Sequence, residues 1–139
     1  GMESLTETRE EFDMKDALTL ERFEEASDVV KAVTLETKLV YSDYFSSQSG
    51  NRVYFKPENM QFTGAYKVRG AYYTMSTLTE EERQRGVITA SAGNHAQGVA
   101  YAAKCYGCKA TIVMPNKHEI NAFLLLFPKK YATKPATTP

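Results

Sequence analysis

The sequence has no net charge and no long hydrophobic segment. Its 139 residues carry 17 basic and 17 acidic side chains, so the charge balance does not favour nucleic acid or an acidic membrane surface as a partner. The longest apolar run, Ala122 to Phe127, is far shorter than the roughly 20 residues of a membrane-spanning helix. The acidic stretch MESLTETREEFD is unlike a signal or transit peptide. We therefore expect a soluble, cytoplasmic chain without nucleic-acid or membrane partners.

Cysteine is scarce, and its two copies form a single C-x-x-C with Cys105 and Cys108. One such pair without a second pair of ligands is weak support for a metal site. Redox pairs usually follow a strand and open a helix, whereas Cys105 lies at the end of an Ala-rich helical run and Cys108 follows Gly107. We interpret both cysteines as packing residues and expect no metal site.

What the sequence does contain is a regular alternation of helical and strand patterns within the size of one domain. Thr19 can cap a first helix. The apolar residues of that helix recur at three- and four-residue spacing and predict one buried face: Leu20, Phe23, Ala26, Val30 and Val33. The segment from Ala65 to Leu78 is also expected to be helical, with Thr63 as its cap.

Three short segments rich in β-forming residues predict strands: Arg52 to Lys56, Val87 to Ser91 and Ala110 to Met114. Helical patterns separate them. One begins at Thr79 with capping-box spacing and ends at Gly86, and another runs from Asn94 to Tyr106 and stops at Gly107. Apolar strands alternating with helices predict an α/β fold with a parallel sheet, right-handed crossovers and helical layers on its faces.

Ligands of such sheets bind beyond the carboxyl ends of the strands, where the amino ends of helices point free N–H groups. The segments TGAYK, which ends at Lys67, and SAGNH, Ser91 to His95, both occupy such places. Small residues at Ala92 and Gly93 let a ligand approach the backbone, and the N–H groups suit a carboxylate. Alternatively, SAGN is only a tight turn with a helix cap, and Lys67 extends its stem to the surface.

Taken together, TGAYKVRGA, SAGNHAQGVA and ATIVMP, in that order and spacing, resemble the threonine/serine ammonia-lyases, or threonine dehydratases, of the fold type II pyridoxal phosphate enzymes. The resemblance begins near LTLERFEEA, strengthens through VYFKPENMQ and ends at Pro115. It implies the amino-terminal portion of the three-layer α/β fold of the tryptophan synthase β-like enzymes. It also implies pyridoxal 5'-phosphate as cofactor and a small amino acid as substrate.

The resemblance implies roles for several residues of the two segments. Lys67 would carry the cofactor as a Schiff base, Tyr66 would pack near the cofactor ring, and Asn94 would hydrogen-bond the ring hydroxyl. The loop that binds the substrate carboxylate would consist of Ser91, Ala92, Gly93, Asn94 and His95. An amine that forms an imine needs a cleft and small neighbours, which accounts for a lysine beside Gly64, Ala65, Gly70 and Ala71.

The family pattern also sets the expected domain organisation: an amino-terminal extension at 1–17, a partial pyridoxal phosphate enzyme domain at 18–115 and a divergent tail at 116–139. Ala65 and Tyr66 stand where the family more often has serine and phenylalanine, and Lys38 stands where proline is common. Family members are commonly dimers or tetramers, so we expect a homo-oligomer.

Three functions remain open at this stage. The first is dehydrative deamination of L-threonine and L-serine to 2-oxobutanoate, pyruvate and ammonia, with this chain a truncated copy that binds cofactor poorly. The second is a serine racemase or another β-eliminating lyase of the same fold. The third is a binding module that keeps the cleft but catalyses nothing.

Overall fold

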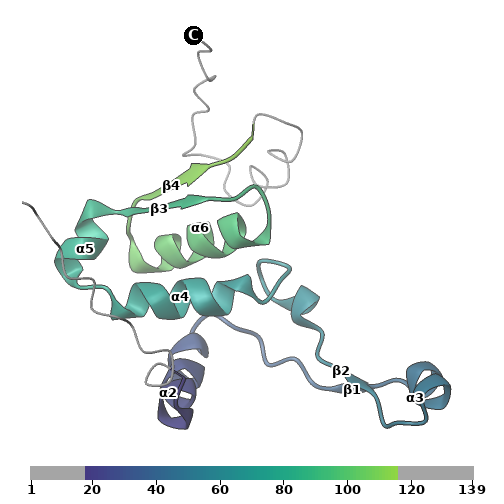
Figure 1. Cartoon of the computed structure of the whole chain (residues 1–139). Helices are drawn as coiled ribbons and strands as arrows, with labels where there is room; N and C mark the ends of the chain where they lie inside the picture. Colours follow the sequence, from purple (N-terminus) through teal and green to yellow (C-terminus); the bar gives the residue numbers. More distant parts are fainter. Residues whose placement is uncertain (1–17, 116–139) are drawn as a thin grey trace, which may run out of the picture.

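The structure is a computed structural model and describes residues 18–115 (Figure 1). The expected extension at 1–17, the expected tail at 116–139 and the apolar run Ala122 to Phe127 lie outside the described residues. Within the described residues, no helix has the length and apolar character that a membrane span requires.

The centre of the fold is a strand, a helix and a second strand in one crossover. Strand β3 (Val87–Ala90) leads into helix α6 (Asn94–Tyr106), which returns the chain to β4 (Ala110–Val113). The two strands pair in parallel, with Val87 opposite Ala110. This confirms the predicted α/β class, the parallel pairing and the bounds of α6.

Successive side chains of each strand point to opposite faces of this sheet, and only one of the two faces is covered. Val87 and Ala110 pack against the core beneath the sheet, and Ile112 packs against α6. The side chains between them point the other way, and Ile88 and Val113 are 72% and 55% exposed. The described residues thus supply the sheet and the helical layer on one of its faces.

Helix α4 (Lys67–Thr77) lies beside α6, on the side of α6 that faces away from the sheet (Figure 1). Small residues along both helices bring the two backbones close together. The buried core between them consists of Ala71, Met75, Val99, Ala102 and Ala103. Val68, on the first turn of α4, is completely buried.

Helix α5 (Glu80–Arg85) is short, with a capping box at its amino end and a glycine at its carboxyl end. Thr79 accepts a hydrogen bond from the backbone N–H of Glu82, whose carboxylate accepts one from the N–H of Thr79, so the predicted capping box is present. Gly86 ends the helix as expected, with a φ of 89° that favours glycine.

We expect Thr79→Ala to lower the free energy of unfolding by about 1 kcal/mol, because it removes one half of the reciprocal cap. Thr77→Ala is the matched control. The Thr77 hydroxyl donates only to the carbonyl of Thr74 within its own helix, at an exposed position, so its loss should change stability little. Urea unfolding of both variants measures the difference, and equal effects would contradict the assignment.

One expected strand pairs differently from the prediction. Tyr54 and Phe55 form β2 (Tyr54–Phe55), within the expected range, but β2 pairs antiparallel with β1 (Val40–Tyr41) in a separate sheet. The expectation that Arg52 to Lys56 belongs to the parallel sheet was therefore wrong. β2 lies in a separate two-stranded sheet, so its backbone groups pair with β1 and not with β3 or β4.

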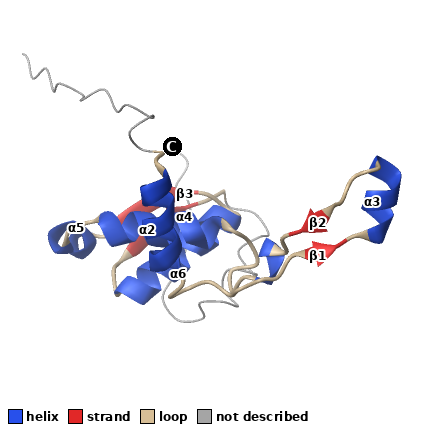
Figure 2. Cartoon of the chain, turned by 90° about the horizontal axis from the view of Figure 1, so that it is seen from below, coloured by secondary structure: helices blue, strands red, loops and turns tan. Residues whose placement is uncertain are grey.

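The connection between β1 and β2 contains helix α3 (Asp43–Ser49), and the three elements project from the body as an arm (Figure 2). Neither β1 nor α3 was predicted. Ser42 caps α3, and Gly50 ends it with a φ of 66°. This cap and stop are the signal in the sequence that could have located the helix.

Helix α2 (Leu20–Val30) begins where expected, with Thr19 accepting a hydrogen bond from the N–H of Arg22. Its predicted buried face is only partly correct. Val30 and Val33 are buried, whereas Leu20 and Phe23 are 68% and 60% exposed. The carboxyl end of α2 meets α4 while its first turns extend away from the body (Figure 1), so its amino-terminal apolar residues reach no partner among the described residues.

Candidate active site

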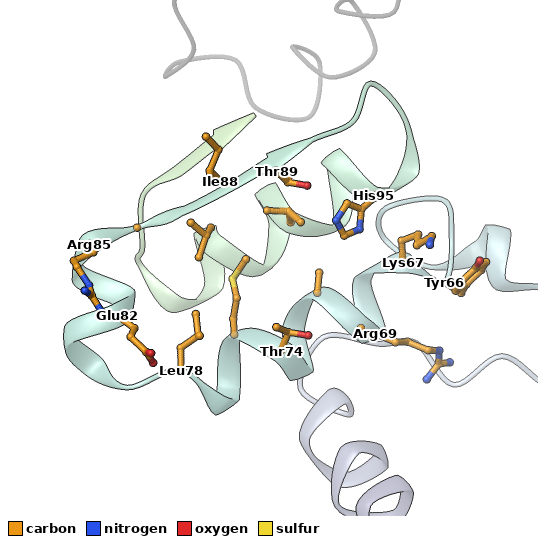
Figure 3. Close-up of a pocket in the computed structure, with 16 residues that line it drawn as sticks. Tyr66, Lys67, Arg69, Thr74, Leu78, Glu82, Arg85, Ile88, Thr89 and His95 are labelled. Atoms are coloured by element: carbon orange, nitrogen blue, oxygen red, sulfur yellow. The ribbon is translucent and has the colours of Figure 1, made fainter. Parts of the chain in front are cut away.

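A pocket of about 850 Å³ opens between α4, α5, β3 and the first turns of α6. Figure 3 shows Tyr66, Lys67 and His95 together at one end of it and Glu82 and Arg85 at the other. The walls between these ends are mostly apolar and small, with Gly70, Ala71, Met75, Leu78, Val87 and Val99 among the lining residues. The lysine singled out in the sequence is therefore one of the residues that line this pocket.

Lys67 is the first residue of α4, and its side chain is solvent-exposed. Its Nζ lies 5.4 Å from the centroid of the Tyr66 ring, within the range of a cation–π contact. Among residues 18–115, Lys67 forms no ion pair with a carboxylate. The amine is thus placed against an aromatic face and is not occupied by an acidic partner in that part of the chain.

The expected cap of this helix was wrong. Thr63 is buried and donates a hydrogen bond to the carbonyl of Ala65, at 3.2 Å, so it caps nothing. Gly64, with a φ of 70°, turns the chain there, and the helix starts at Lys67 rather than at Ala65. The residue at the cap position is Tyr66, which makes no side-chain capping hydrogen bond.

The second predicted segment forms the turn from β3 into α6. The Ser91 hydroxyl accepts a hydrogen bond from the N–H of Gly93, and Gly93 occupies the cap position of α6 without a side-chain cap. Asn94 is the first residue of α6, so Lys67 and Asn94 both stand at helix amino ends. The SAGN segment thus forms the tight strand-to-helix turn of the structural alternative, but without the side-chain cap that this alternative included.

The structure brings only part of this segment to the pocket. His95 lines the pocket with Lys67 and Tyr66, while Ser91, Ala92, Gly93 and Asn94 are not among its lining residues. Successive residues of a helix point about 100° apart, so Asn94 and His95 face different directions. Of the expected carboxylate-binding loop, His95 therefore lines the same pocket as Lys67, whereas the Asn94 side chain does not.

Gly98 was not recognised from the sequence as part of the site. A Cβ atom at this position would lie 3.0 Å from the backbone C and O atoms of Lys67 and 3.1 Å from the backbone N of Val68. Helix α6 therefore meets the backbone of α4 at the candidate lysine itself. A glycine inside an otherwise Ala-rich helix is the sequence signal for such a close approach.

Glu58 and Arg69 form an ion pair that the sequence did not reveal. Nε and Nη2 of Arg69 each donate a hydrogen bond of 2.9 Å to the Glu58 carboxylate. These hydrogen bonds are the main reason that the pKa of Glu58 lies below its ordinary value of 4.5. Folding therefore favours the ionised carboxylate. The resulting stability is present above the ordinary pKa and is lost as the pH falls through the lowered pKa of the folded state.

We expect Glu58→Gln to make the free energy of unfolding less dependent on pH below neutrality. Between about pH 7 and about pH 3 the wild-type chain should lose more free energy of unfolding than the variant, because only the wild type has this carboxylate to protonate. Urea unfolding across that range measures the difference between the two chains. Parallel profiles would contradict a contribution from the Glu58–Arg69 pair.

The C-x-x-C lies away from the pocket lining. Cys105 is in the last turn of α6, Cys108 follows Gly107 and packs against the core, and both thiols are free. Burial raises the pKa of the Cys105 thiol, the reverse of the shift in a redox-active cysteine. Residues 18–115 contain no cluster of three or more metal-ligating side chains. The packing interpretation is therefore supported for Cys108, whereas Cys105 is exposed.

Comparison with known families matches residues 30–128 to the model described as "Pyridoxal-phosphate dependent enzyme". This match spans more than half of the chain. The chain belongs to the pyridoxal-phosphate dependent enzyme family. Its fold is accordingly that of the fold type II members of the family, of which the described residues form the amino-terminal part.

Curated relatives carry more specific names. The chain is 54% identical over 98 residues to the L-threonine ammonia-lyase of Thermotoga maritima, covering 70% of this chain and 24% of that protein. It is 46% identical over 98 residues to the biosynthetic L-threonine dehydratase of Lactococcus lactis, with the same coverage. The chain spans about a quarter of the length of these relatives.

Solved structures agree on the family. Threonine deaminase isoform 2 of Solanum lycopersicum superimposes with a TM-score of 0.66 at 42% identity, covering 76% of this chain and 31% of that one. Maize serine racemase superimposes with a TM-score of 0.73 at 33% identity, covering 79% and 35%. The fold is shared by enzymes of both names.

The residues at the pocket fit the cofactor of this family. Pyridoxal phosphate requires a primary amine, a flat apolar contact for its ring and donors for its anionic groups. Lys67 and Tyr66 provide the first two in contact with each other. The amino end of α6 has no side-chain cap, and Gly93 has open space where a Cβ would lie, so N–H groups are accessible there.

Proposed function

We propose that this protein takes part in the pyridoxal phosphate-dependent dehydrative deamination of L-threonine, and of L-serine, to 2-oxobutanoate or pyruvate and ammonia. The observation that carries the proposal is the position of Lys67. It opens a helix at the end of a pocket, beside an aromatic ring and opposite His95, in a chain 54% identical to an L-threonine ammonia-lyase.

The proposed roles follow from what each group can do. Lys67 would hold the cofactor and, when its amine is released, remove the α-proton of the amino acid. Tyr66 would support the cofactor ring. The N–H groups at the amino end of α6 would bind the substrate carboxylate in the turn Ser91 to His95. Asn94 does not line the pocket itself, but as the first residue of α6 it stands beside His95 and would contact the ring hydroxyl there.

When bound, pyridoxal phosphate supplies an electron-accepting ring that takes up the electron pair left by the α-proton. Loss of that proton and of the β-hydroxyl group removes one water from the amino acid. The enamine product then takes up water and releases ammonia, so atoms balance without an oxidant. Because the methyl group that distinguishes threonine from serine is worth only about 1–3 kcal/mol in a pocket, we propose that both amino acids are used.

A second candidate function is racemisation of serine. It is favoured by the superposition on maize serine racemase, whose TM-score of 0.73 exceeds that of the tomato threonine deaminase at 0.66. The deaminase proposal is preferred because the tomato enzyme is 42% identical and the racemase 33%. The products, a 2-oxo acid or D-serine, separate the two functions.

We also propose that the protein acts in the cytoplasm as a homo-oligomer. The arm formed by β1, α3 and β2 supports the second part, because it exposes apolar and aromatic side chains that a partner could cover. These are Val40, Tyr41, Tyr44, Phe45, Tyr54 and Phe55, each at least 43% exposed. Sedimentation velocity measures the oligomeric state, and a monomer at all concentrations would contradict the proposal.

The test is a chimaera in which the 98 matched residues of the Thermotoga maritima enzyme are replaced by those of this chain. With L-threonine the chimaera should release 2-oxobutanoate and ammonia, and with L-serine pyruvate. D-serine as the main product would favour the racemase instead. The 139-residue chain assayed alone is the control, and we expect no measurable product from it, because it spans about a quarter of its relatives.

A further inference from the structure

The first turn of α4 is fixed by something other than a helix cap. Tyr66, at the cap position, makes no side-chain capping hydrogen bond, and the first turn contains no acidic residue. An uncapped helix end usually frays, and a fraying end would leave the Lys67 amine without a defined position. The contacts that do hold this turn therefore decide where the amine lies.

Arg69 is the residue that ties this turn to the preceding loop. Its backbone N–H donates to the carbonyl of Tyr66, so it belongs to the same turn as Lys67. Its side chain donates two parallel hydrogen bonds to Glu58, from Nε to Oε2 and from Nη2 to Oε1, both 2.9 Å long. This bidentate geometry restricts direction as well as distance, which a single contact cannot do.

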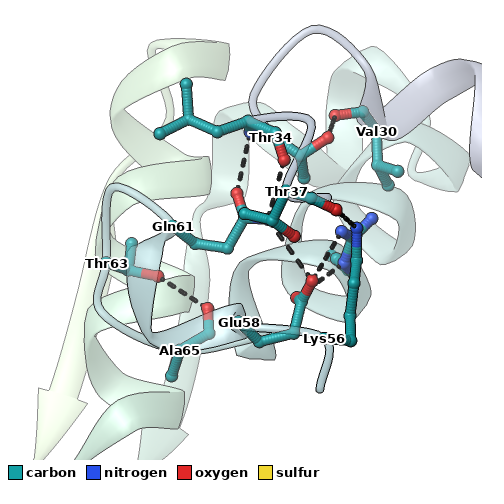
Figure 4. A network of polar contacts seen from close by, with 10 residues as sticks. Val30, Thr34, Thr37, Lys56, Glu58, Gln61, Thr63 and Ala65 are labelled. Atoms are coloured by element: carbon teal, nitrogen blue, oxygen red, sulfur yellow. Dashed lines mark hydrogen bonds and ion pairs between the residues drawn. The ribbon is translucent and has the colours of Figure 1, made fainter. Parts of the chain in front are cut away.

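Glu58 is itself held in place. It opens the short 3₁₀ helix η1 (Glu58–Met60), and its Oε1 accepts a hydrogen bond from Nε2 of Gln61 at 3.4 Å. Gln61 is only 4% exposed, and its amide makes two further hydrogen bonds to the backbone of Leu35, at 2.8 and 3.0 Å. Figure 4 shows these contacts joining two loops that are far apart in the sequence.

The opposite side of the turn is held by α6. The missing side chain of Gly98 lets the backbone of Lys67 lie against α6, and Val68 is completely buried beside it. The Glu58–Arg69 ion pair, which we call the latch, therefore holds the turn on one side, and packing against α6 holds it on the other. From this turn, Tyr66, Lys67 and Arg69 line the pocket (Figure 3).

We propose that Glu58 and Arg69 are positioning residues that fix the Lys67 amine relative to the amino end of α6. This inference rests on the proposed function of Lys67 as the amine that holds the cofactor. The latch does not touch the reacting atoms. It keeps the first turn of α4 in one orientation, so that a cofactor aldehyde whose ring hydroxyl is held at the amino end of α6 meets the amine in a productive geometry.

The test measures where pyridoxal 5'-phosphate reacts on the 139-residue chain. A low concentration is added, the product is trapped with borohydride, and peptide mapping gives the share of label on each lysine. In the wild type the share of label on Lys67 should exceed the share on every other lysine. Glu58→Gln should lower its share at least about fivefold, because a displacement of about 1 Å can cost a reacting group up to about 100-fold.

Further variants separate positioning from stability. Arg69→Lys keeps the positive charge but cannot make the two parallel hydrogen bonds of a guanidinium, so it should also lower the share of label on Lys67. This variant tests the proposal if Glu58→Gln does not fold. The double exchange Glu58→Arg with Arg69→Glu should restore part of the share. Thr79→Ala is the matched control: Thr79 does not line the pocket, and its capping partner Glu82 lies at the end of the pocket away from Lys67, so the share should be unchanged.

Each outcome bears on one claim. If the wild-type chain shows no preference for Lys67, the proposed function of Lys67 in this chain fails, and the latch fails with it. If Lys67 is preferred and Glu58→Gln and Arg69→Lys keep that preference, only the latch is overturned. If Thr79→Ala lowers the share as much as Glu58→Gln, the effect is one of stability, and the positioning role is also overturned.

Discussion

Gly98→Ala is expected to destabilise the fold by about 1–3 kcal/mol, although alanine is the better helix former. The new Cβ would lie 3.0 Å from the backbone of Lys67, which cannot yield easily because Val68 beside it is completely buried. Gly98→Val adds two further carbon atoms at the same contact and should destabilise still more. Urea unfolding of the two variants measures both effects.

Gly70→Ala is the matched control. Gly70 also lies within a helix, but a Cβ there would meet no atom within 4 Å, so the substitution should stabilise by about 0.5–1 kcal/mol through helix propensity. Opposite signs at the two glycines would establish the contact between α4 and α6 in solution. If Gly98→Ala stabilised the chain as much as Gly70→Ala, the described packing of the candidate lysine would be wrong.

Lys67→Ala in the chimaera with the Thermotoga maritima enzyme should abolish release of 2-oxobutanoate. The substitution removes the amine proposed to hold the cofactor and to move the α-proton, and a positioned base alone contributes about 10²–10⁴-fold. Lys67→Arg should fail as well, because a guanidinium keeps the charge but is always protonated. The readout is the initial rate of 2-oxo acid formation.

Lys38→Ala serves as the control for that experiment. Lys38 is an exposed lysine that does not line the pocket, so its removal should leave the rate within about twofold of the parent chimaera. A Lys67→Ala chimaera that retains a tenth or more of the parent rate would contradict the role of Lys67, since about 1.4 kcal/mol corresponds to that factor.

Elements with strong local signals were predictable from the sequence. The capping box at Thr79 and the stop at Gly107 depend on neighbouring residues and were found as predicted. The strand predicted at Ala110 to Met114 was found at Ala110–Val113. The parallel pairing followed from the order of strand, helix and strand. Local chemistry and chain order were therefore sufficient for the centre of the fold.

Contacts between distant segments were not predictable in this way. The strand pairing of Tyr54 with Tyr41 and the hydrogen bonds between Gln61 and Leu35 join residues whose partners no periodicity specifies. The exposure of Phe23 has the same origin, since a helical pattern shows which face is apolar but not how far a partner extends along it.

The candidate site was predicted in part for a similar reason. Lys67 and the amino end of α6 carry recognisable motifs, and both stand at helix amino ends, although α4 begins at Lys67 and not at Ala65. Whether the side chain of Asn94 or that of His95 enters the pocket depends on the rotation of α6 about its axis. That rotation is set by the packing of Gly98 against α4, which the sequence alone does not reveal.

The measurement that tests the central claim most directly is the site of cofactor attachment in the active chimaera. Incubation with pyridoxal 5'-phosphate, reduction with borohydride and peptide mapping by mass spectrometry locate the modified lysine. We predict one cofactor per chain, on Lys67, with the label lost and not relocated in Lys67→Ala. Label distributed over several surface lysines, or concentrated on a lysine other than Lys67 while the chimaera turns over threonine, would contradict the proposed site.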